Sequence, residues 1–299
     1  MQVKRTWQRV DGVLLLDKPL GLTSNDALQK ARRLFSAAKG GHTGTLDPAA
    51  TGLLPLCFGE ATKFSADLLD ADKTYEAVVK LGVTTDTGDA EGQVVATAPV
   101  AVDEAMILQA LPQFTGAIEQ IPPMHSALKR NGRPLYELAR KGIEVERAPR
   151  AVTIHDLELL DFAGDALILR VRCSKGTYIR VLAADLGRVL GCGAHLTALR
   201  RTVVGDLTLT GAITLAELEA LDEAGRMERL QPVDALLQSL PVVELAGEAA
   251  DRFSHGNPVD LPAGLGGKIR VYAEGRLIGV GEPAADGRLW PKRLVQLSA

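Results

Sequence analysis

The chain has 299 residues and a formal net charge of −3, and 46% of its residues are hydrophobic and 24% charged. These proportions are typical of a folded globular protein and exclude the biased composition of a disordered chain. The slightly acidic total does not by itself indicate a nucleic-acid binder, so that function would have to rest on local clusters of charge.

Membrane and metal functions find no support in the sequence. No apolar run reaches the length of about 18 residues that spans a membrane, and the first twelve residues lack the apolar core of a signal peptide. We therefore expect a cytoplasmic protein without membrane contact. Cys57, Cys173 and Cys192 are far apart and form no C-x-x-C pair, which predicts buried thiols and no structural zinc.

Short strands and helices alternate in the first half of the chain. Residues 13–16 predict a buried strand that breaks at Lys18, and the spacing of apolar residues over 24–35 predicts a helix. Residues 74–81 alternate in polarity, which predicts a strand with Tyr75 at its beginning and on its buried face.

The segment from Met124 to Arg150 is the conspicuous basic part of the chain. It holds seven basic residues and three glutamates, a local net charge of +4. Such a patch favours phosphate contacts. Individual members such as Lys141 are equally compatible with a solvated, charged helix.

Farther along, residues 152–162 and 166–173 predict a β-hairpin. A helix is predicted after Thr177, with Tyr178 and Arg180 in its first turn.

A domain boundary is predicted near Leu240, which divides the chain into residues 1–240 and 241–299. The second part combines short alternating runs with many glycines, and this pattern predicts a small β-barrel.

The stretch GHTGTLDPAATG surrounds Asp47 with small residues and allows two interpretations. Asp47 is typical of a helix N-cap when proline follows at the first helical position. The glycines on both sides would also let a substrate approach a reactive carboxylate. His42 likewise could be a functional residue or a ring bonded to backbone.

Five motifs together resemble the bacterial tRNA pseudouridine-55 synthases, the TruB family of pseudouridine synthases. In chain order they are LLLDKPxGxTS, HTGTLDPxATG, KTYEAVVKLGVTTDTGDAEG, PPMHSALKRNGRPLYELARKG and CSKGTYIRVLAADLG. They cover about the first two hundred residues, and the resemblance weakens beyond them. The chain has Ala49 where the family commonly has leucine, and His125 where a tyrosine is expected.

The resemblance implies an α+β fold: a mixed, mainly antiparallel central sheet flanked by helices and loops, the pseudouridine synthase fold. Residues 124–150 would form an inserted basic loop that closes over the RNA. Residues 241–299 would form a PUA-like RNA-binding domain with a small β-barrel.

The implied reaction is the isomerisation of uridine 55 in the T-loop of tRNA to pseudouridine, after the base has been flipped out of its stack. Asp47 would be the nucleophile, Arg180 would pair with it, and Tyr75 would pack on the base and take part in loss of the C5 proton. Attack at C1′, addition at C6 and abstraction of the C2′ proton are all compatible with the sequence. No metal, nucleotide or other cofactor is implied, and the chain has no P-loop.

Other residues match family positions that bind the substrate. Tyr178 and Leu199 would line the uridine pocket, His42 would occupy the displaced nucleotide stack, and Lys18 would support the pocket. Within the basic segment, Lys129 and Arg130 are the candidates for phosphate contacts.

Two other functions compete with this interpretation. A protein that only binds tRNA and assists its folding would need the scaffold but no catalytic carboxylate, and the enzyme could also assist folding. A glycoside hydrolase would need a second carboxylate facing Asp47, and no motif predicts one convincingly. A monomer is the default expectation.

Overall fold

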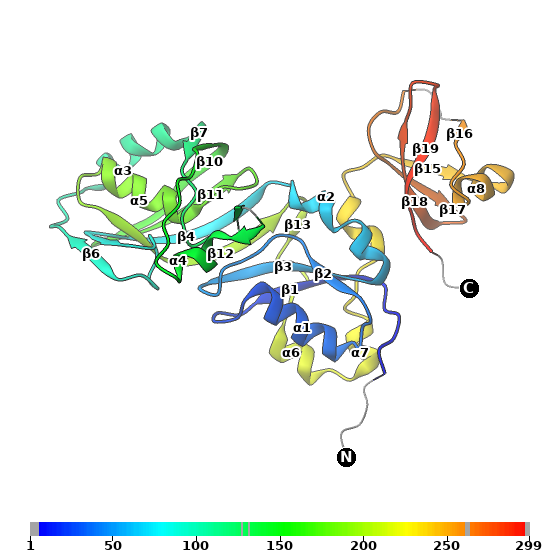
Figure 1. The fold of residues 1–299 in the computed structure, drawn as a ribbon, viewed down its shortest axis with the longest axis horizontal. Helices are drawn as coiled ribbons and strands as arrows, with labels where there is room; N and C mark the ends of the chain where they lie inside the picture. The colour runs from blue at the N-terminus through cyan, green and yellow to red at the C-terminus, as the bar shows by residue number, and fades with distance from the viewer. Residues whose placement is uncertain (1–5, 127, 131, 261–263, 297–299) are drawn as a thin grey trace, which may run out of the picture.

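The computed structural model describes residues 6–126, 128–130, 132–260 and 264–296. A ten-stranded sheet forms the centre of the larger lobe (Figure 1), with the order β14-β1-β3-β12-β4-β11-β10-β7 and with β2 beside β3 and β13 beside β12. Its strands are β1 (Gly12–Lys18), β2 (Gly40–His42), β3 (Ala50–Phe58), β4 (Lys73–Leu81), β7 (Gly116–Gln120), β10 (Arg150–Ala163), β11 (Ala166–Cys173), β12 (Ala194–Val204), β13 (Leu207–Thr208) and β14 (Ile213–Thr214).

Helices and short ribbons cover this sheet. The α-helices are α1 (Ser24–Leu34), α2 (Ser65–Leu69), α3 (Glu104–Ala110), α4 (Leu135–Ala139), α5 (Ile179–Val189), α6 (Leu215–Ala220) and α7 (Glu223–Met227). The 3-10 helices are η1 (Gly59–Lys63), η2 (Leu111–Phe114) and η3 (Val233–Leu237), and the ribbons are β5 (Val83–Thr85) with β6 (Val94–Thr97) and β8 (Lys129–Arg130) with β9 (Arg133–Pro134).

Apolar side chains fix the layers of the larger lobe. Helices α3 and α5 pack against β4 and β11 in one cluster, and α1 and α6 pack against β1 and β3 in another. Within the described residues, the pairs β1–β14 and β3–β12 are parallel and the other pairs of this sheet are antiparallel. The predicted α+β class with a mixed, mainly antiparallel sheet is confirmed.

Most elements lie where the periodicity indicates. Strand β4 covers the predicted segment, and its Ala77, Val79 and Leu81 are buried while Tyr75 is half-buried. Strands β10 and β11 form the predicted hairpin. The three cysteines are buried free thiols, as expected.

The predicted helix start at Asp47 is wrong. Asp47 and Pro48 belong to a β-turn, in which the Asp47 carbonyl accepts a hydrogen bond from the Ala50 amide at 3.0 Å. Proline suits the second position of such a turn as well as it suits the first turn of a helix. The chain continues as strand β3 because residues 52–58 pair along the whole of β1.

The start of α5 also differs from the prediction. Thr177 donates its hydroxyl to the Ser174 carbonyl at 2.9 Å, inside the preceding turn, and does not cap the helix. Tyr178 is the N-cap residue and α5 begins at Ile179, so Arg180 is still in the first turn.

The smaller lobe is a curled sheet of five strands in the order β15-β17-β18-β19-β16 (Figure 1). Its elements are β15 (Val242–Leu245), α8 (Gly247–Ser254), β16 (Val259–Asp260), β17 (Ile269–Ala273), β18 (Arg276–Pro283) and β19 (Arg288–Leu294). It has its own apolar cluster around Phe253, and the sheet is consistent with the predicted PUA-like barrel.

Ionic contacts join the two lobes, and one of them is buried. Arg270 of β17 pairs with Asp234 of η3 at 3.2 Å, and the Tyr272 hydroxyl bonds to the same carboxylate. Lys268 pairs with Asp67 of α2. Among the described residues, no helix has the length and apolar character that crossing a membrane requires.

Gly52 allows β3 and β12 to approach closely next to the turn that carries Asp47. Its φ is +101°, and a Cβ at this position would lie 2.2 Å from the Arg201 carbonyl oxygen. Any side chain here would push the two strands apart.

We expect Gly52→Ala to lower the free energy of unfolding by about 2 kcal/mol or more, because it adds backbone strain and a steric clash. The midpoint of thermal unfolding measures this loss. Gly41→Ala is the matched control, since a Cβ there has no neighbour within 4 Å. Equal midpoints for both variants would contradict the close approach of β3 and β12.

Candidate active site

One cavity of about 240 Å³ brings together five residues that the sequence analysis singled out. They come from the turn before β3, the start of β4, the start of α5 and the middle of β12. The five are Asp47, Tyr75, Tyr178, Arg180 and Leu199.

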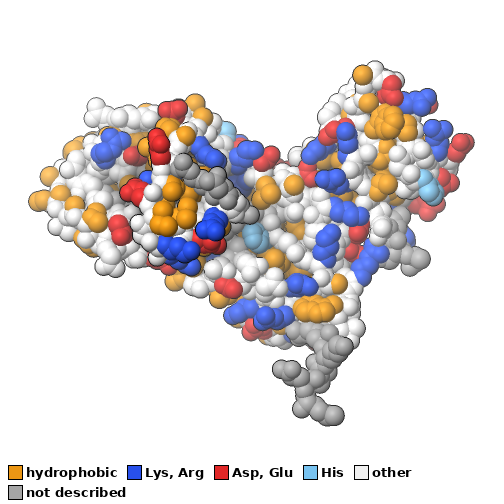
Figure 2. Space-filling view, viewed as in Figure 1, with side chains coloured by type: hydrophobic (Ala, Val, Ile, Leu, Met, Phe, Trp, Pro, Cys, Tyr) orange, Lys and Arg blue, Asp and Glu red, His pale blue; other side chains and the backbone are white. Residues whose placement is uncertain are grey.

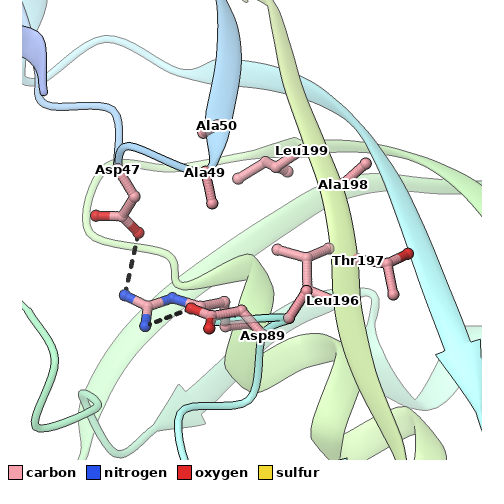
Figure 3. Close-up of a pocket in the computed structure, with 10 residues that line it drawn as sticks. Asp47, Ala49, Ala50, Asp89, Leu196, Thr197, Ala198 and Leu199 are labelled. Atoms are coloured by element: carbon pink, nitrogen blue, oxygen red, sulfur yellow. Dashed lines mark hydrogen bonds and ion pairs between the residues drawn. The ribbon is translucent and has the colours of Figure 1, made fainter. Parts of the chain in front are cut away.

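The Arg180 guanidinium is the centre of this site. Its Nη2 lies 3.1 Å from Oδ2 of Asp47, and its Nη1 lies 3.0 Å from Oδ2 of Asp89 (Figure 3). The Arg180 side chain is 9% exposed, whereas that of Asp47 is 50% exposed. Arg180 is thus held inside the protein and presents Asp47 to the open side of the cavity.

Two segments besides Asp47 contact the same guanidinium. The His125 carbonyl, in the basic segment, accepts a hydrogen bond from Nη2 at 2.7 Å. Asp89 lies in the turn between β5 and β6, where it also accepts hydrogen bonds from the Thr87 hydroxyl at 2.6 Å and the Glu91 amide at 3.1 Å. These contacts fix Arg180 before any substrate arrives.

The sequence analysis did not identify Asp89. The sequence feature that could have identified it is its position in the acidic, glycine-containing turn TTDTGDAEG. In the structure, Asp89 is the one carboxylate of this turn that is buried. Burial of a carboxylate requires a cationic partner, but the sequence does not say that this partner is Arg180. Asp89 uses its oxygens as hydrogen-bond acceptors, so it does not resemble the proton-donating second acid of a glycoside hydrolase.

Tyr75 shares the cavity with a second buried arginine, Arg201 of β12, which the sequence analysis also missed. Burial raises the pKa of the Tyr75 phenol, and the charge of Arg201 opposes that rise. Arg201 is 1% exposed, and it donates from Nε to the Leu53 carbonyl at 2.8 Å and from Nη2 to the Gly44 carbonyl at 3.2 Å. Adjacent arginines in the motif HLTALRR were the available signal.

Tyr178 and Leu199 complete the wall of the cavity. The Tyr178 backbone is fixed by Gln120 of β7, whose side chain accepts from the amide at 2.9 Å and donates to the carbonyl at 3.2 Å. Leu199 lies on β12 opposite Asp47 in the view of Figure 3. Both residues thus line the same cavity as Asp47.

Lys18 and His42 do not line the cavity of Asp47. The Lys18 ammonium is buried and donates to the carbonyls of Pro19 at 2.9 Å and Leu22 at 2.7 Å. Burial lowers its pKa to about 8, against the opposing charge of Asp47. Burial also lowers the pKa of His42, whose Nδ1 has no hydrogen-bond partner in the described part of the chain.

The phosphate-binding candidates lie elsewhere in the basic segment. Lys129 and Arg130 form the two residues of β8, and their side chains lie outside the described part of the structure. Residues 6–126, 128–130, 132–260 and 264–296 contain no group of three or more His, Cys, Asp or Glu side chains that could hold a metal ion.

Family models match three consecutive parts of the chain. Residues 32–179 match the N-terminal domain of the TruB family of pseudouridylate synthases. Residues 180–238 match the C-terminal domain of tRNA pseudouridylate synthase B, and residues 241–295 match the C-terminal part of pseudouridine synthase II TruB.

Two relatives are similar along the whole chain, and both are named tRNA pseudouridine synthase B. That of Dechloromonas aromatica (strain RCB) is 78% identical over 298 residues, which are 100% of both chains. That of Aromatoleum aromaticum (strain DSM 19018 / LMG 30748 / EbN1) is 63% identical over 290 residues, 97% of this chain and 94% of the relative. The chain therefore belongs to the TruB family of pseudouridine synthases.

Solved structures share the fold. A chain from an H/ACA RNP bound to a substrate RNA containing 2′-deoxyuridine matches with a TM-score of 0.72 and 25% identity, over 96% of this chain and 85% of that chain. A chain from a Cbf5-Nop10-Gar1 complex matches with a TM-score of 0.69 and 29% identity, over 91% and 78%.

The low pKa of Lys18 has a measurable consequence for stability. Between pH 8 and the ordinary lysine pKa of 10.5, the unfolded chain binds a proton at this side chain that the folded chain does not. The wild type should therefore gain stability relative to Lys18→Met as the pH rises through this window, by about 1–3 kcal/mol.

Urea unfolding at pH 7.5 and at pH 10 measures this difference. Lys30→Met makes the same change at an exposed position and serves as the control. A stability difference between wild type and Lys18→Met that does not change with pH would contradict the depressed pKa.

Proposed function

We propose that this protein isomerises uridine 55 in the T-loop of tRNA to pseudouridine. The observation that carries the proposal is the 3.1 Å ion pair of Asp47 and Arg180 beside Tyr75 in one cavity, in a chain 78% identical to a protein named tRNA pseudouridine synthase B. The reaction breaks the bond from C1′ to N1 and forms one from C1′ to C5, so substrate and product have the same composition.

Asp47 is proposed as the nucleophile. A carboxylate can form a covalent intermediate at an electrophilic carbon and leave again. Half of the Asp47 side chain is exposed, which leaves one face open to a substrate while Arg180 contacts the other. Because Arg180 is itself anchored by Asp89, it orients Asp47 without having to reorganise during the reaction.

Tyr75 is proposed to pack against the flipped uracil and to accept the C5 proton. Its side chain packs against two apolar clusters of the larger lobe, and an aromatic ring offers a flat apolar face to a base. Tyr178 and Leu199 are proposed to form the rest of the uracil pocket. Lys18 is proposed to support the pocket from outside its lining, and His42 to occupy the displaced nucleotide stack.

The basic segment is proposed to close over the RNA. Flipping a nucleotide out of its stack costs a few kcal/mol, and contacts to phosphates can offset this cost. Closure of this segment would also affect the position of Arg180 directly, because the His125 carbonyl in the segment accepts a hydrogen bond from the Arg180 guanidinium. A histidine in place of the tyrosine expected at this position leaves that contact intact because it uses the backbone.

The proposal also covers the roles of the two domains, the cellular location and the oligomeric state. Residues 1–240 would form the catalytic domain and residues 241–299 a PUA-like RNA-binding domain. Figure 2 shows Lys and Arg side chains interspersed with Asp and Glu on the smaller lobe and on the adjoining edge of the larger one. The protein would act in the cytoplasm as a monomer, and would also assist tRNA folding by unstacking the T-loop.

We expect Asp47→Asn to abolish pseudouridine formation on a T-arm RNA and to leave the dissociation constant within about tenfold, because the amide removes the nucleophile but keeps the shape. Single-turnover assays and a binding titration on the same RNA measure both quantities. Asp206→Asn changes an exposed carboxylate and should retain full activity. Pseudouridine formation by Asp47→Asn would contradict the assignment of Asp47 as the nucleophile.

Replacing Lys129 and Arg130 by glutamine should weaken RNA binding and flatten its dependence on salt. The slope of log K against log salt should fall by about one unit for each lost phosphate contact. The control neutralises Lys80 and Arg170, which already pair with Asp165 and Glu158. If the salt dependence of binding has the same slope in the Lys129/Arg130 variant and in the control variant, Lys129 and Arg130 do not contact the RNA.

A further inference from the structure

Arg201 is the buried cation next to Tyr75, and the mechanism above gives it no role. The two residues are partners in the register of β12 and β4, and both line the cavity of Asp47. Arg201 is 1% exposed and is one of the largest fully buried side chains of the protein.

The charge of Arg201 is not neutralised by a neighbouring acid. Within the described residues it forms no ion pair with a carboxylate, and it donates hydrogen bonds to the backbone carbonyls of Leu53 and Gly44. Burying a cation without an anionic partner is costly. A neutral side chain could hold the same two carbonyls at less cost, so the positive charge itself requires an explanation.

The Tyr75 phenol is the group that this charge can act on. The groups that affect its ionisation come from three elements: Arg201 of β12, Cys173 of β11 and Asp47 of the turn before β3. Burial raises the pKa of Tyr75, and Cys173 and Asp47 raise it further, whereas Arg201 lowers it through its charge and through a hydrogen bond. Arg180 and Lys73 also line the cavity.

We propose that Arg201 is a positioning residue that acts through Tyr75, stabilising the phenolate that accepts the C5 proton. This inference rests on the proposed function and adds to it the group that makes the tyrosine a usable base. Tyrosine is a poor proton acceptor while its oxygen keeps its own proton. A guanidinium beside the oxygen favours the ionised form in a buried site, where charges interact strongly.

Once C5 is bonded to C1′, the C5–H bond breaks and its proton passes to the phenolate oxygen of Tyr75. The electron pair of that bond forms the C5–C6 double bond, and the electrons of the C6–N1 double bond move to N1, which takes up a proton. Tyr75 then loses its proton to solvent, and Arg201 is unchanged throughout.

Tyrosine labelled with ¹³C at Cζ reports phenol ionisation directly, because the chain has only four tyrosines. Tyr75→Phe assigns the signal, and a pH titration of the free protein needs no RNA. In Arg201→Gln we expect the Tyr75 midpoint to rise by at least about one pH unit. Arg201→Lys keeps a charge and should shift the midpoint less. Arg170→Gln, an exposed arginine of β11, should leave it unchanged.

Single-turnover rates on T-arm RNA give the second readout. Because the pKa of Tyr75 lies above its ordinary value, a one-unit rise of the midpoint lowers the phenolate fraction at pH 7 about tenfold, so we expect Arg201→Gln to react at least about tenfold more slowly there, with the dissociation constant nearly unchanged. The pH at which the rate levels off should move up with the Tyr75 midpoint, whereas a purely structural role would lower the rate without moving that pH. Circular dichroism at each pH checks that the variant is folded.

Two results would overturn the inference. One is an unchanged Tyr75 midpoint in folded Arg201→Gln, and the other is a rate that levels off at the same pH in Arg201→Gln and in the wild type. If the proposed function is wrong, the wild type itself forms no pseudouridine. The Tyr75 midpoint could still respond to Arg201 in that case, so the two failures can be distinguished.

Discussion

The position of the Arg180 guanidinium is the constraint on which the rest of the site depends. Three chain segments far apart in sequence meet there: the turn that carries Asp47, the turn that carries Asp89, and the basic segment at His125. A guanidinium is planar and donates hydrogen bonds in several fixed directions, so it can bond to all three segments at once, whereas a lysine ammonium is a single point of charge. The ten-stranded sheet and α5 bring these segments to one place.

The second feature is a surplus of buried positive charge in and around the site. Lys18, Lys73 and Arg201 are buried, and within the described residues their hydrogen bonds go to backbone carbonyls. Each of these cations reduces the stability of the folded protein. Such a cost is consistent with the proposed reaction, in which negative charge lies first on Asp47 and then on the base or on Tyr75.

Much of this arrangement could be predicted from the sequence, and the failures have physical reasons. Periodicity sufficed for β4 and the β10–β11 hairpin, because each buries one face. It failed at Asp47, since proline after aspartate suits a β-turn as well as a helix start, and pairing of β3 with β1 decides between them. Asp89 and Arg201 were missed because their importance comes from long-range partners, Arg180 and Tyr75, which no local pattern specifies.

The most direct test of the account is to incubate the purified protein with an unmodified tRNA transcript, with a chelator and without added nucleotide, and to map pseudouridine along the RNA. The account predicts one new pseudouridine, at position 55 of the T-loop, at full yield. A transcript that remains unmodified, or one modified at another position, would contradict it.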